Sequence, residues 1–546
     1  MEMVETYQRM ALTSLRRVLT RLDRRPWSPT YGSFDREYWK YKTLIGFPRL
    51  THQTCILSLA LLYKNPFPGN FAAGNEKILE WIRAGISFWL ANRTREGAVD
   101  EWFENEKSFC ATAYTTYAIS EAIILLNGDL ENNFRKTSLE SLSKSGEWLT
   151  RHKNAWIGNQ MVVSAAALYN LSILLNSVKF QKAFEKRKKE ILAMQKSEGW
   201  FIEYGGCDLG YSLLTLDTLA ALWNRSKDSE IASSMDRLLE FIEYFIAPDG
   251  SCGGEIGSRS TAHSFPFGLE LLARSGRRRA LDSLARVRGG IIREDVATPL
   301  TVDDTYLSYF YINSFVRAAL LESQVLKSAV VEGTVRKKYF EQAGLFVHEA
   351  PSHFFVLASK KGGVWRCFRK QDGARGDFGY IAMTHEGKCL SSQQVSTVSV
   401  EEGGPEGLHF KISCPFGEVD ASLPLKRHLI AFQVFTKWIL RIPGLSEIFT
   451  NLLKRKKILN VKLSQLTLER SVTIGPHQCR IQDVLRAPAP MALKDLYSSF
   501  ESATVHSPSS QNFITSSLTP DRAVVRGMLE EMSHSGLARA TLTVDF

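Results

Sequence analysis

Hydrophobic positions divide the chain into a helical part and a strand-rich part. From about residue 50 to residue 327, apolar residues recur at steps of three and four, as in NEKILEWIRAGISFWLA and NQMVVSAAALYNLSILL. That spacing gathers apolar side chains on one helix face and predicts helices. From about Val335 the apolar runs are short, β-rich and separated by Gly, Pro or charged turns, which predicts strands. The boundary therefore falls between Leu326 and Val335.

Three regions follow from this pattern. We expect residues 1–330 to form a helical domain with an N-terminal arm, and residues 331–490 to form an antiparallel β-sandwich. Within the second region, residues 435–459 (FTKWILRIPGLSEIFTNLLKRKKIL) are typical of an amphipathic helix that ends in basic residues. Residues 491–546 include the polar stretch HSPSSQNFITSSLTP, and we interpret them as an extended tail with little core.

Turns in which an acidic residue precedes glycine recur in the helical part. They are EGAVDEWFENE (96–106), EGWFIEYGGCD (198–208) and DGSCGGEIGSR (249–259), and the loop HKNAWIGNQ (152–160) falls in the gap between the first two. The helices that follow begin near Ser108, Asn159, Tyr211 and His263, at steps of about 51 or 52 residues. A period of two helices per unit predicts stacked helical hairpins. We therefore expect an (α/α) toroid of about five to six hairpins, followed by the β-sandwich.

In such a toroid these loops would share one rim. The N-termini of the inner helices would point at this rim, where unpaired N–H groups and the positive dipole end suit a carboxylate. The net charge of +11 also favours an acidic partner, such as a polyanionic glycan or an anionic membrane. Two simpler interpretations stay open: a basic protein without a polyanion, and turns that merely separate helices.

Two loops combine aromatic and charged residues at the start of the chain. The segment SPTYGSFDREYWKYK offers platforms for sugar rings and cations for acid groups, or else packs as an arm; its candidate residues are Asp35, Arg36, Tyr38, Trp39 and Lys42. In EWFENEKSF, neighbouring carboxylates can raise one another's pKa and supply a general acid, or else cap a helix. The candidates there are Glu101, Trp102 and Asn105, with Glu104 and Glu106 beside them.

The later loops supply the remaining candidates. Asn159 and Gln160 stand at a helix start, where Asn159 can cap the helix or hydrogen-bond a substrate carboxylate. In EGWFIEYGGCDLGY, a tyrosine near cations can lose its proton and act as a base, or else pack locally. The candidates are Glu203, Tyr204, Asp208 and Tyr211. GGEIGSRSTAH brings together Glu255, Arg259 and His263, and its Gly257 would let the backbone approach a ligand.

Other classes of function find little support in the sequence. P-loop, G-x-S-x-G, HExxH and nucleic-acid motifs are missing, and the eight scattered cysteines include no CxxC pair, so we expect no cofactor, metal or nucleic acid. The N-terminus has no apolar core of signal-peptide length and no segment is long enough to span a membrane. We expect a cytoplasmic protein, with peripheral contact of residues 435–459 at the inner face of an anionic membrane as an open alternative.

The layout and two loops resemble the heparinase II/III-like family of polysaccharide lyases and uronate epimerases, over about Ser28 to Leu485. GNQ (158–160) lies where the family carries Asn-His, with Gln160 in place of the histidine, and EGWFIEYGGCDLGY is similar to a family loop that leads to a catalytic tyrosine. The H-x-H-x-D segment of the family's β domain is missing.

The resemblance implies a reaction on a uronic-acid polysaccharide. Asn159 would neutralise the uronate carboxylate, and Tyr211 or Tyr204 would move the C5 proton. Loss of the C4 substituent would then give β-elimination, and reprotonation from the other face would give C5 epimerisation, as in exopolysaccharide or O-antigen production. Two alternatives stay open. One is a glycoside hydrolase that pairs Glu101 or Glu104 with Glu203 or Glu255, and the other is a glycan-binding protein without catalysis.

Overall fold

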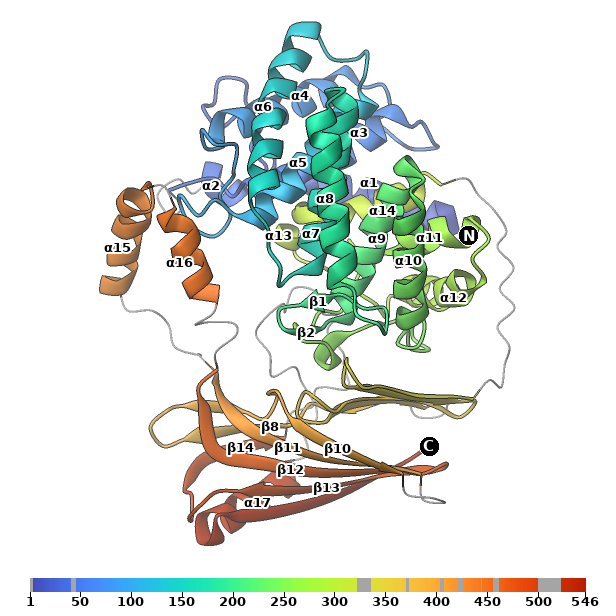
Figure 1. Ribbon diagram of the computed structural model, residues 1–546, viewed down its shortest axis with the longest axis vertical. Helices are drawn as coiled ribbons and strands as arrows, with labels where there is room; N and C mark the ends of the chain where they lie inside the picture. Colours follow the sequence, from blue (N-terminus) through green and yellow to red (C-terminus); the bar gives the residue numbers. More distant parts are fainter. Residues whose placement is uncertain are drawn as a thin grey trace.

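The computed structural model describes residues 3–40, 46–321, 335–369, 373–402, 407–419, 426–442, 444–454, 461–498 and 522–546. Lys42, one of the predicted binding residues, lies outside these ranges. The described chain combines helices up to Ala319 with strands from Arg336 onwards (Figure 1). This confirms the mixture of helical and strand-rich parts that the hydrophobic pattern predicts. Within the described ranges, no helix is long and apolar enough to cross a membrane.

The long helices of the first part alternate between an inner and an outer layer. The inner helices are α3 (Cys55–Lys64), α5 (Phe109–Leu125), α7 (Gly158–Leu174), α9 (Leu209–Ser226), α11 (Pro266–Arg274) and α14 (Ile312–Ala319). The outer helices are α1 (Met3–Arg21), α4 (Glu76–Asn92), α6 (Asn132–Arg151), α8 (Val178–Met194), α10 (Ser229–Ile242) and α12 (Arg278–Arg293). Short elements join them: α2 (Arg36–Lys40), α13 (Asp304–Tyr306), a π-helical turn (Leu307–Tyr311) and 3₁₀ turns at Leu50–Thr54 and Gly254–Ile256.

The inner helices contact one another in a closed order. α3 contacts α5, and the contacts continue through α7, α9, α11 and α14 back to α3. Each inner helix also contacts at least one outer helix, and α14 at the end of this part contacts α1 at its beginning. The sequence explains the layers, because α5 and α7 are apolar or small on nearly all sides and are buried almost throughout, whereas α10 and α12 are amphipathic.

Glycines in the recurrent turns hold the hairpins together. Gly97, Gly199 and Gly250 all have positive φ angles, of 96°, 104° and 86°. A Cβ atom on any of them would lie within 2.5 Å of the backbone of the next outer helix, at Lys144, Arg237 and Arg286 respectively. Only glycine combines this backbone conformation with so close a contact. The repeated acid–glycine turn is therefore a packing device of the hairpin repeat.

The second part consists of two antiparallel sheets. The five-stranded sheet has the order β3 (Arg336–Phe340), β4 (Leu345–Ala350), β5 (His353–Ala358), β6 (Val364–Arg369) and β7 (Gly373–Asp377). The eight-stranded sheet has the order β14 (Leu493–Ser498), β8 (Tyr380–Thr384), β9 (Cys389–Ser391), β11 (Leu408–Val419), β12 (Leu463–Ile474), β13 (Gln478–Arg486) and β15 (Leu537–Asp545), with β10 (Thr397–Glu402) paired to β11.

The smaller sheet lies between the helical part and the larger sheet (Figure 1). One face of β5 belongs to the core of the helical part through Phe354 and Val356. Its other face packs with the larger sheet through Phe355 and Leu357. All six residues of β5 are buried for this reason, and the strand is a nearly unbroken apolar run. The strand thereby brings its flanking turn, which carries Lys361, against the helical rim.

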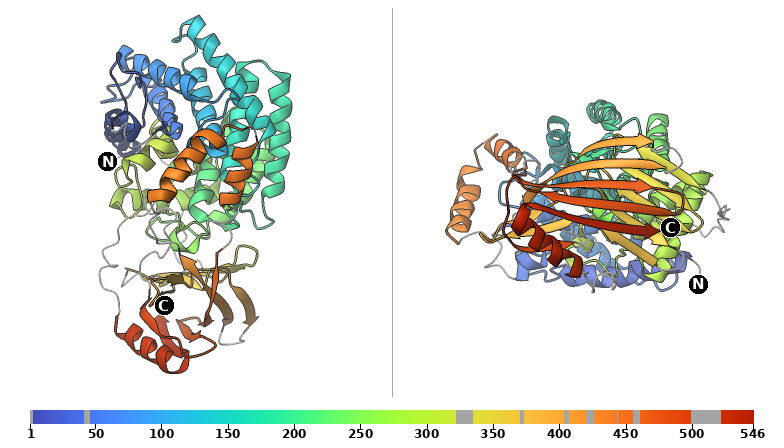
Figure 2. Two further views of the ribbon diagram at one scale, coloured as in Figure 1. Left: turned by 90° about the vertical axis from the view of Figure 1, so that its left-hand side faces the viewer. Right: turned by 90° about the horizontal axis from the view of Figure 1, so that it is seen from below.

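Two predictions about the second half of the chain are wrong. Residues 491–546 are not an extended tail, because β14 and β15 are strands of the larger sheet and α17 (Arg522–Ser535) packs across it (Figure 2). Residues 435–459 are not one helix. The described chain forms α15 (Lys426–Val434), a π-helical turn (Phe435–Ile439) and α16 (Leu445–Lys454), and the break before α16 contains Gly444 at a φ of 80°.

Candidate functional site

Asn159 and Glu203 form the centre of a buried polar group at the start of α7. The Asn159 backbone N–H donates to Glu203 Oε1 at 2.7 Å, and its Nδ2 donates to Oε2 at 2.8 Å. The Tyr114 hydroxyl donates to Asn159 Oδ1 at 3.0 Å. Glu203 comes from β1 (Ile202–Glu203), which pairs with β2 (Gly206–Cys207) in a small hairpin between α8 and α9. Burial raises the pKa of Glu203 well above its usual range, so the carboxyl tends to hold its proton.

Tyr204, Tyr211 and Arg259 form the next part of this polar group. Tyr204 has a φ of 53°, and the guanidinium carbon of Arg259 lies 4.2 Å from the centre of its ring. The rings of Tyr204 and Tyr211 are 6.4 Å apart. Burial raises the pKa of both phenols, while the Arg259 charge acts in the opposite direction. Arg259 Nε is buried and has no hydrogen-bond partner among the described residues, so it is an unused donor within the group.

His263 continues the group on the other side of Tyr211. Its ring lies 5.6 Å from the Tyr211 ring and stacks on the Tyr306 ring at 4.9 Å. The Tyr306 hydroxyl is hydrogen-bonded to His263 Nε2. Burial lowers the pKa of His263 to about 3, so its imidazole is neutral at physiological pH.

These side chains close into a ring. Phe310 lies 6.3 Å from Tyr306 and stacks on Tyr114 at 4.5 Å, and Tyr114 leads back to Asn159. We call this set the rim cluster: Tyr114, Asn159, Glu203, Tyr204, Tyr211, Arg259, His263 and Tyr306. The structure thus brings together six of the predicted residues from loops that are up to 104 positions apart, between Asn159 and His263.

Tyr114 and Tyr306 were not predicted from the sequence. Tyr114 stands in the apolar helix α5, and Tyr306 stands in TVDDTYLSYFY, where four aromatic residues are spread over one short stretch of ordinary core pattern. A usable signal was the position of each tyrosine near an inner-helix start. Tyr306 is capped there by Asp303, which accepts a hydrogen bond from its backbone N–H at 2.9 Å.

Asp208 organises the loops beneath the rim cluster. It is fully buried and caps α9 by accepting from the Tyr211 N–H at 3.0 Å. It also accepts from the Arg259 N–H at 2.8 Å and from the Thr261 hydroxyl. A Cβ on Gly257 would lie 2.6 Å from Asp208 Oδ2. The expectation that Gly257 opens the backbone to a ligand is therefore corrected: the close approach is to Asp208, and Asp208 itself is a positioning residue.

A lysine of the β part secures the same loop. Lys361, between β5 and β6, donates from Nζ to the Glu255 carbonyl at 2.7 Å, to the Gly257 carbonyl at 2.5 Å and to Ser260 Oγ at 2.9 Å. Its ammonium is buried, and desolvation lowers its pKa to about 8. The candidate Glu255 thus takes part through its backbone carbonyl. The β part contributes Lys361 to the support of the loop that presents Arg259.

The N-terminal candidates do not join the rim cluster. Asp35 forms an ion pair with Arg49 at 2.9 Å, and Trp39 Nε1 donates to the Arg21 carbonyl at 2.7 Å. The Tyr38 ring packs against Phe88 at 6.5 Å, and Arg36 is partly exposed on α2. The interpretation of this segment as a packed arm therefore fits its contacts better than direct substrate binding.

The same arm contains a group of possible metal ligands. Asp35, Glu37 and His52 could offer one ligand atom each to a single ion. However, Arg49 Nη2 lies 2.9 Å from Asp35 and 2.7 Å from Glu37, and Arg21 lies 2.9 Å from Glu37. Two guanidinium groups already neutralise the carboxylates and would repel a cation. These residues do not fit a metal site.

The candidates Glu101, Trp102 and Asn105 also have other contacts. Glu101 accepts from the Ser108 hydroxyl at 2.8 Å, Trp102 is 72% exposed, and Asn105 Nδ2 donates to the Thr436 carbonyl at 3.0 Å. Glu106 is buried beside Glu101, and burial together with that neighbouring charge raises its pKa to about 8. Gln160 accepts from Asn154 Nδ2 at 3.0 Å.

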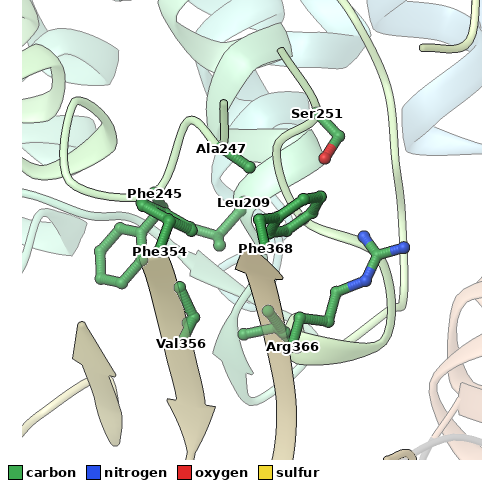
Figure 3. Close-up of a pocket in the computed structure, with 10 residues that line it drawn as sticks. Leu209, Phe245, Ala247, Ser251, Phe354, Val356, Arg366 and Phe368 are labelled. Carbon is green, nitrogen blue, oxygen red and sulfur yellow. The ribbon is translucent and has the colours of Figure 1, made fainter. Parts of the chain in front are cut away.

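A small hollow lies where the rim loops meet the five-stranded sheet (Figure 3). Leu209 and Phe245 line it from the helical part, and Phe354, Val356 and Phe368 line it from the sheet. Arg366 extends along one side, where its Nη1 would lie 3.5 Å from a Cβ on Gly254. The walls are mostly apolar side chains of the core, so this hollow is a gap in the packing between the two parts and offers no reactive group.

Burial of His263 predicts a specific loss of stability in acid. The pKa of its imidazole is about 3 in the folded protein and about 6.5 when exposed. Between these values the unfolded chain binds the additional proton, so the free energy of unfolding falls as the pH decreases from 6.5 to 3, by about 4–5 kcal/mol. Denaturant unfolding at a series of pH values should show this slope in the wild type. The slope should be reduced in His263→Gln and unchanged in the exposed control His477→Gln. Equal slopes in all three proteins would contradict the prediction.

Comparisons with known proteins give a likeness of fold. No family model and no curated protein sequence matches the chain. Among solved structures, the chondroitin AC lyase of Streptomyces coelicolor A3, solved in complex with chondroitin sulphate, has a TM-score of 0.54 at 10% identity over 90% of this chain and 68% of its own. A Paenibacillus xanthan lyase has a TM-score of 0.54 at 12% identity, over 91% of this chain and 46% of its own, so this chain spans less than half of that enzyme.

These likenesses extend over both the helical part and the sheets. At 10% and 12% identity they show a common fold and leave the family open. The present chain has the fold of polysaccharide lyases.

Proposed function

We propose that this protein acts on an acidic, uronic-acid-containing polysaccharide by removing the proton at C5 of a uronate, as a lyase or a C5-epimerase. The observation that carries the proposal is the rim cluster, where a guanidinium, an amide, a carboxyl, an imidazole and phenols from separate loops face one another. The lyase-like fold supports the same class of reaction. In this proposal the closed order of inner helices is an (α/α) toroid with about six hairpins.

The contacts suggest a division of roles within the cluster. Arg259, with its unpaired Nε, binds the uronate carboxylate, and the second amide hydrogen of Asn159 assists. Neutralising this carboxylate makes the C5 proton more acidic, because the carbanion that forms can delocalise its charge onto it. Burial raises the pKa of Glu203, which favours its neutral form and reduces repulsion of the incoming anion. The role predicted for Asn159 is thereby shared with Arg259.

In this proposal the phenols transfer the proton. Tyr211 or Tyr204 exchanges a proton with C5 or with the C4 leaving oxygen, and the Arg259 charge favours the phenolate that this requires. Neutral His263 is hydrogen-bonded to the Tyr306 hydroxyl and positions it on the other side of Tyr211. Loss of the C4 substituent gives an unsaturated uronate, whereas return of a proton to the opposite face gives the epimer.

One assay tests the proposal against its alternatives. The protein is incubated in deuterated water with uronate polymers, beginning with chondroitin sulphate, and the products are examined by ultraviolet absorbance and mass spectrometry. Unsaturated products indicate a lyase, and deuterium at C5 without cleavage indicates an epimerase. Saturated fragments would replace the proposal by a glycoside hydrolase, and binding without any product would replace it by a glycan-binding protein. A role in exopolysaccharide or O-antigen production, a cytoplasmic location and membrane contact of residues 435–459 stay predictions.

A further inference from the structure

The helices α15 and α16 present large apolar side chains to solvent. They pack on each other through Phe432 and Phe449, whose rings are 6.2 Å apart, and stand to one side of the helical part (Figures 1 and 2). Their exposed apolar residues are between 43% and 63% accessible: Leu429, Ile430, Val434, Trp438, Ile439, Ile442, Ile448 and Leu452. A surface helix of a water-soluble protein normally turns its polar side outward. So much exposed aliphatic surface indicates a partner.

The inward side of these helices is already occupied. Ser446 Oγ donates to the Asn105 carbonyl at 2.7 Å and to the Glu106 carbonyl at 2.6 Å. The Phe103 ring packs against Phe432 at 5.5 Å and against Phe449 at 5.9 Å. These contacts fix α16 on the loop before α5. The outward apolar residues therefore belong to a second face, which we call the α15–α16 surface and define by the eight residues named above.

The charges around this surface have one predominant sign. Between residues 426 and 454 the sequence has five cationic residues, Lys426, Arg427, Lys437, Arg441 and Lys454, against the single acid Glu447. Arg427, Lys437 and Arg441 are exposed, and Arg441 also forms a long ion pair of 3.9 Å with Glu104 of the helical part. Ile448 and Leu452 are four residues apart on the outer side of α16, as Ile430 and Val434 are on α15. The surface thus combines aliphatic anchors, a tryptophan and cations.

We propose that the α15–α16 surface docks on an anionic lipid bilayer. Amphipathic helices at the bilayer interface insert aliphatic and tryptophan side chains below the head groups, while Lys and Arg contact anionic lipids. A second copy of the chain fits less well, because a symmetric contact would bring the same cations together. A glycan site would present aromatic faces and hydrogen-bonding groups in place of isoleucines. The proposal does not depend on the reaction proposed above.

The structure changes the surface that the sequence predicted. A single helix over 435–459 would rely on Lys454–Lys457 for its charge, whereas the observed surface begins at α15 and has exposed cations at Arg427, Lys437 and Arg441. Because α16 is hydrogen-bonded to the loop at Asn105, docking would also place the helical rim beside the bilayer. A substrate linked to lipid, or a polymer held at the membrane, would then be presented to that side of the protein.

Vesicle flotation with the full-length protein tests the proposal. Vesicles of phosphatidylcholine mixed with phosphatidylglycerol should bind the protein, more strongly at low salt, and phosphatidylcholine alone should bind it weakly. Ile430→Ser/Ile448→Ser/Leu452→Ser should abolish binding. Lys437→Gln/Arg441→Gln should lower the partition coefficient by about 30-fold, since each cation near an anionic surface contributes about 1 kcal/mol. The three aliphatic side chains are exposed. Lys437 and Arg441 are exposed as well, so both variants should retain the fold.

A matched control removes the same charge elsewhere. Lys182→Gln/Lys186→Gln takes two exposed lysines from α8, and Val395→Ser takes an apolar residue that is 85% exposed. Both controls should bind vesicles like the wild type. Equal loss in the lysine control, or no binding of the wild type to anionic vesicles, would overturn the proposal. So would a dimer in analytical ultracentrifugation that the triple serine variant dissociates, because the surface would then be a contact between two copies.

Discussion

Replacing Tyr211 by phenylalanine should lower turnover of a uronate polymer by a factor of about 10² to 10⁴, the usual contribution of a positioned acid or base. The substitution removes one hydroxyl and keeps the ring that packs between Tyr204 and His263. Burial holds the Tyr211 phenol protonated at rest, so its proton is available to a leaving oxygen. Tyr204→Phe in parallel decides which of the two phenols moves the proton, because only that variant should show the full loss.

Two measurements separate chemistry from structure in this experiment. Tyr169→Phe is the matched control: its ring packs against Phe184 at 5.0 Å in the outer layer, away from the rim cluster, and it should turn over substrate like the wild type. Deuterium incorporation at C5 reports proton removal independently of cleavage. If Tyr211→Phe and Tyr204→Phe both retained wild-type turnover and exchange, proton transfer by these two phenols would be ruled out.

The hairpin repeat could be predicted because its signal is local and recurs. Each acid–glycine turn needs its glycine because the residue has a positive φ and contacts the next outer helix. The recurrence of Gly97, Gly199 and Gly250 therefore makes the period visible in the sequence. The loops that contain Asn159, Tyr204 and Tyr211 follow from that period. That these loops lie close together depends on the closed order of the inner helices, which the repeat led us to expect.

Other features depend on contacts that no local pattern reveals. Tyr114 and Tyr306 lie in segments with an ordinary core pattern, and only the fold brings them beside Asn159 and His263. The strand β15 was missed because it follows a long polar segment, although Ala538 and Val544 alternate toward the core. Candidates such as Asp35 were misleading in the opposite way, since an Asp–Arg pair that braces the fold has the same composition as a binding site.

Among the contacts between the helical part and the β part, we expect the site to depend most on those of Lys361. In Lys361→Met a side chain of similar length replaces the ammonium, and three acceptors on the loop at Glu255, Gly257 and Ser260 lose their buried donor. Each unsatisfied group costs about 1–3 kcal/mol, and partial relaxation should leave a decrease of about 3–5 kcal/mol in the free energy of unfolding. Lys360→Met, at an exposed neighbouring position, should stay within about 0.5 kcal/mol of the wild type.

The pH dependence of stability and the kinetics of Lys361→Met show whether the lost stability comes from the Lys361 amine. The pKa of Lys361 is about 8 when folded and 10.5 when exposed, so the unfolded chain holds the additional proton between these values. Wild-type stability should rise by about 3 kcal/mol over that interval relative to Lys361→Met, because the buried amine loses a costly charge and still donates hydrogen bonds. Under conditions in which Lys361→Met stays folded, displacement of the loop that presents Arg259 should raise KM for the polymer more than it lowers kcat. A variant as stable as Lys360→Met, with an unchanged KM, would show that the β part does not support the site through this lysine.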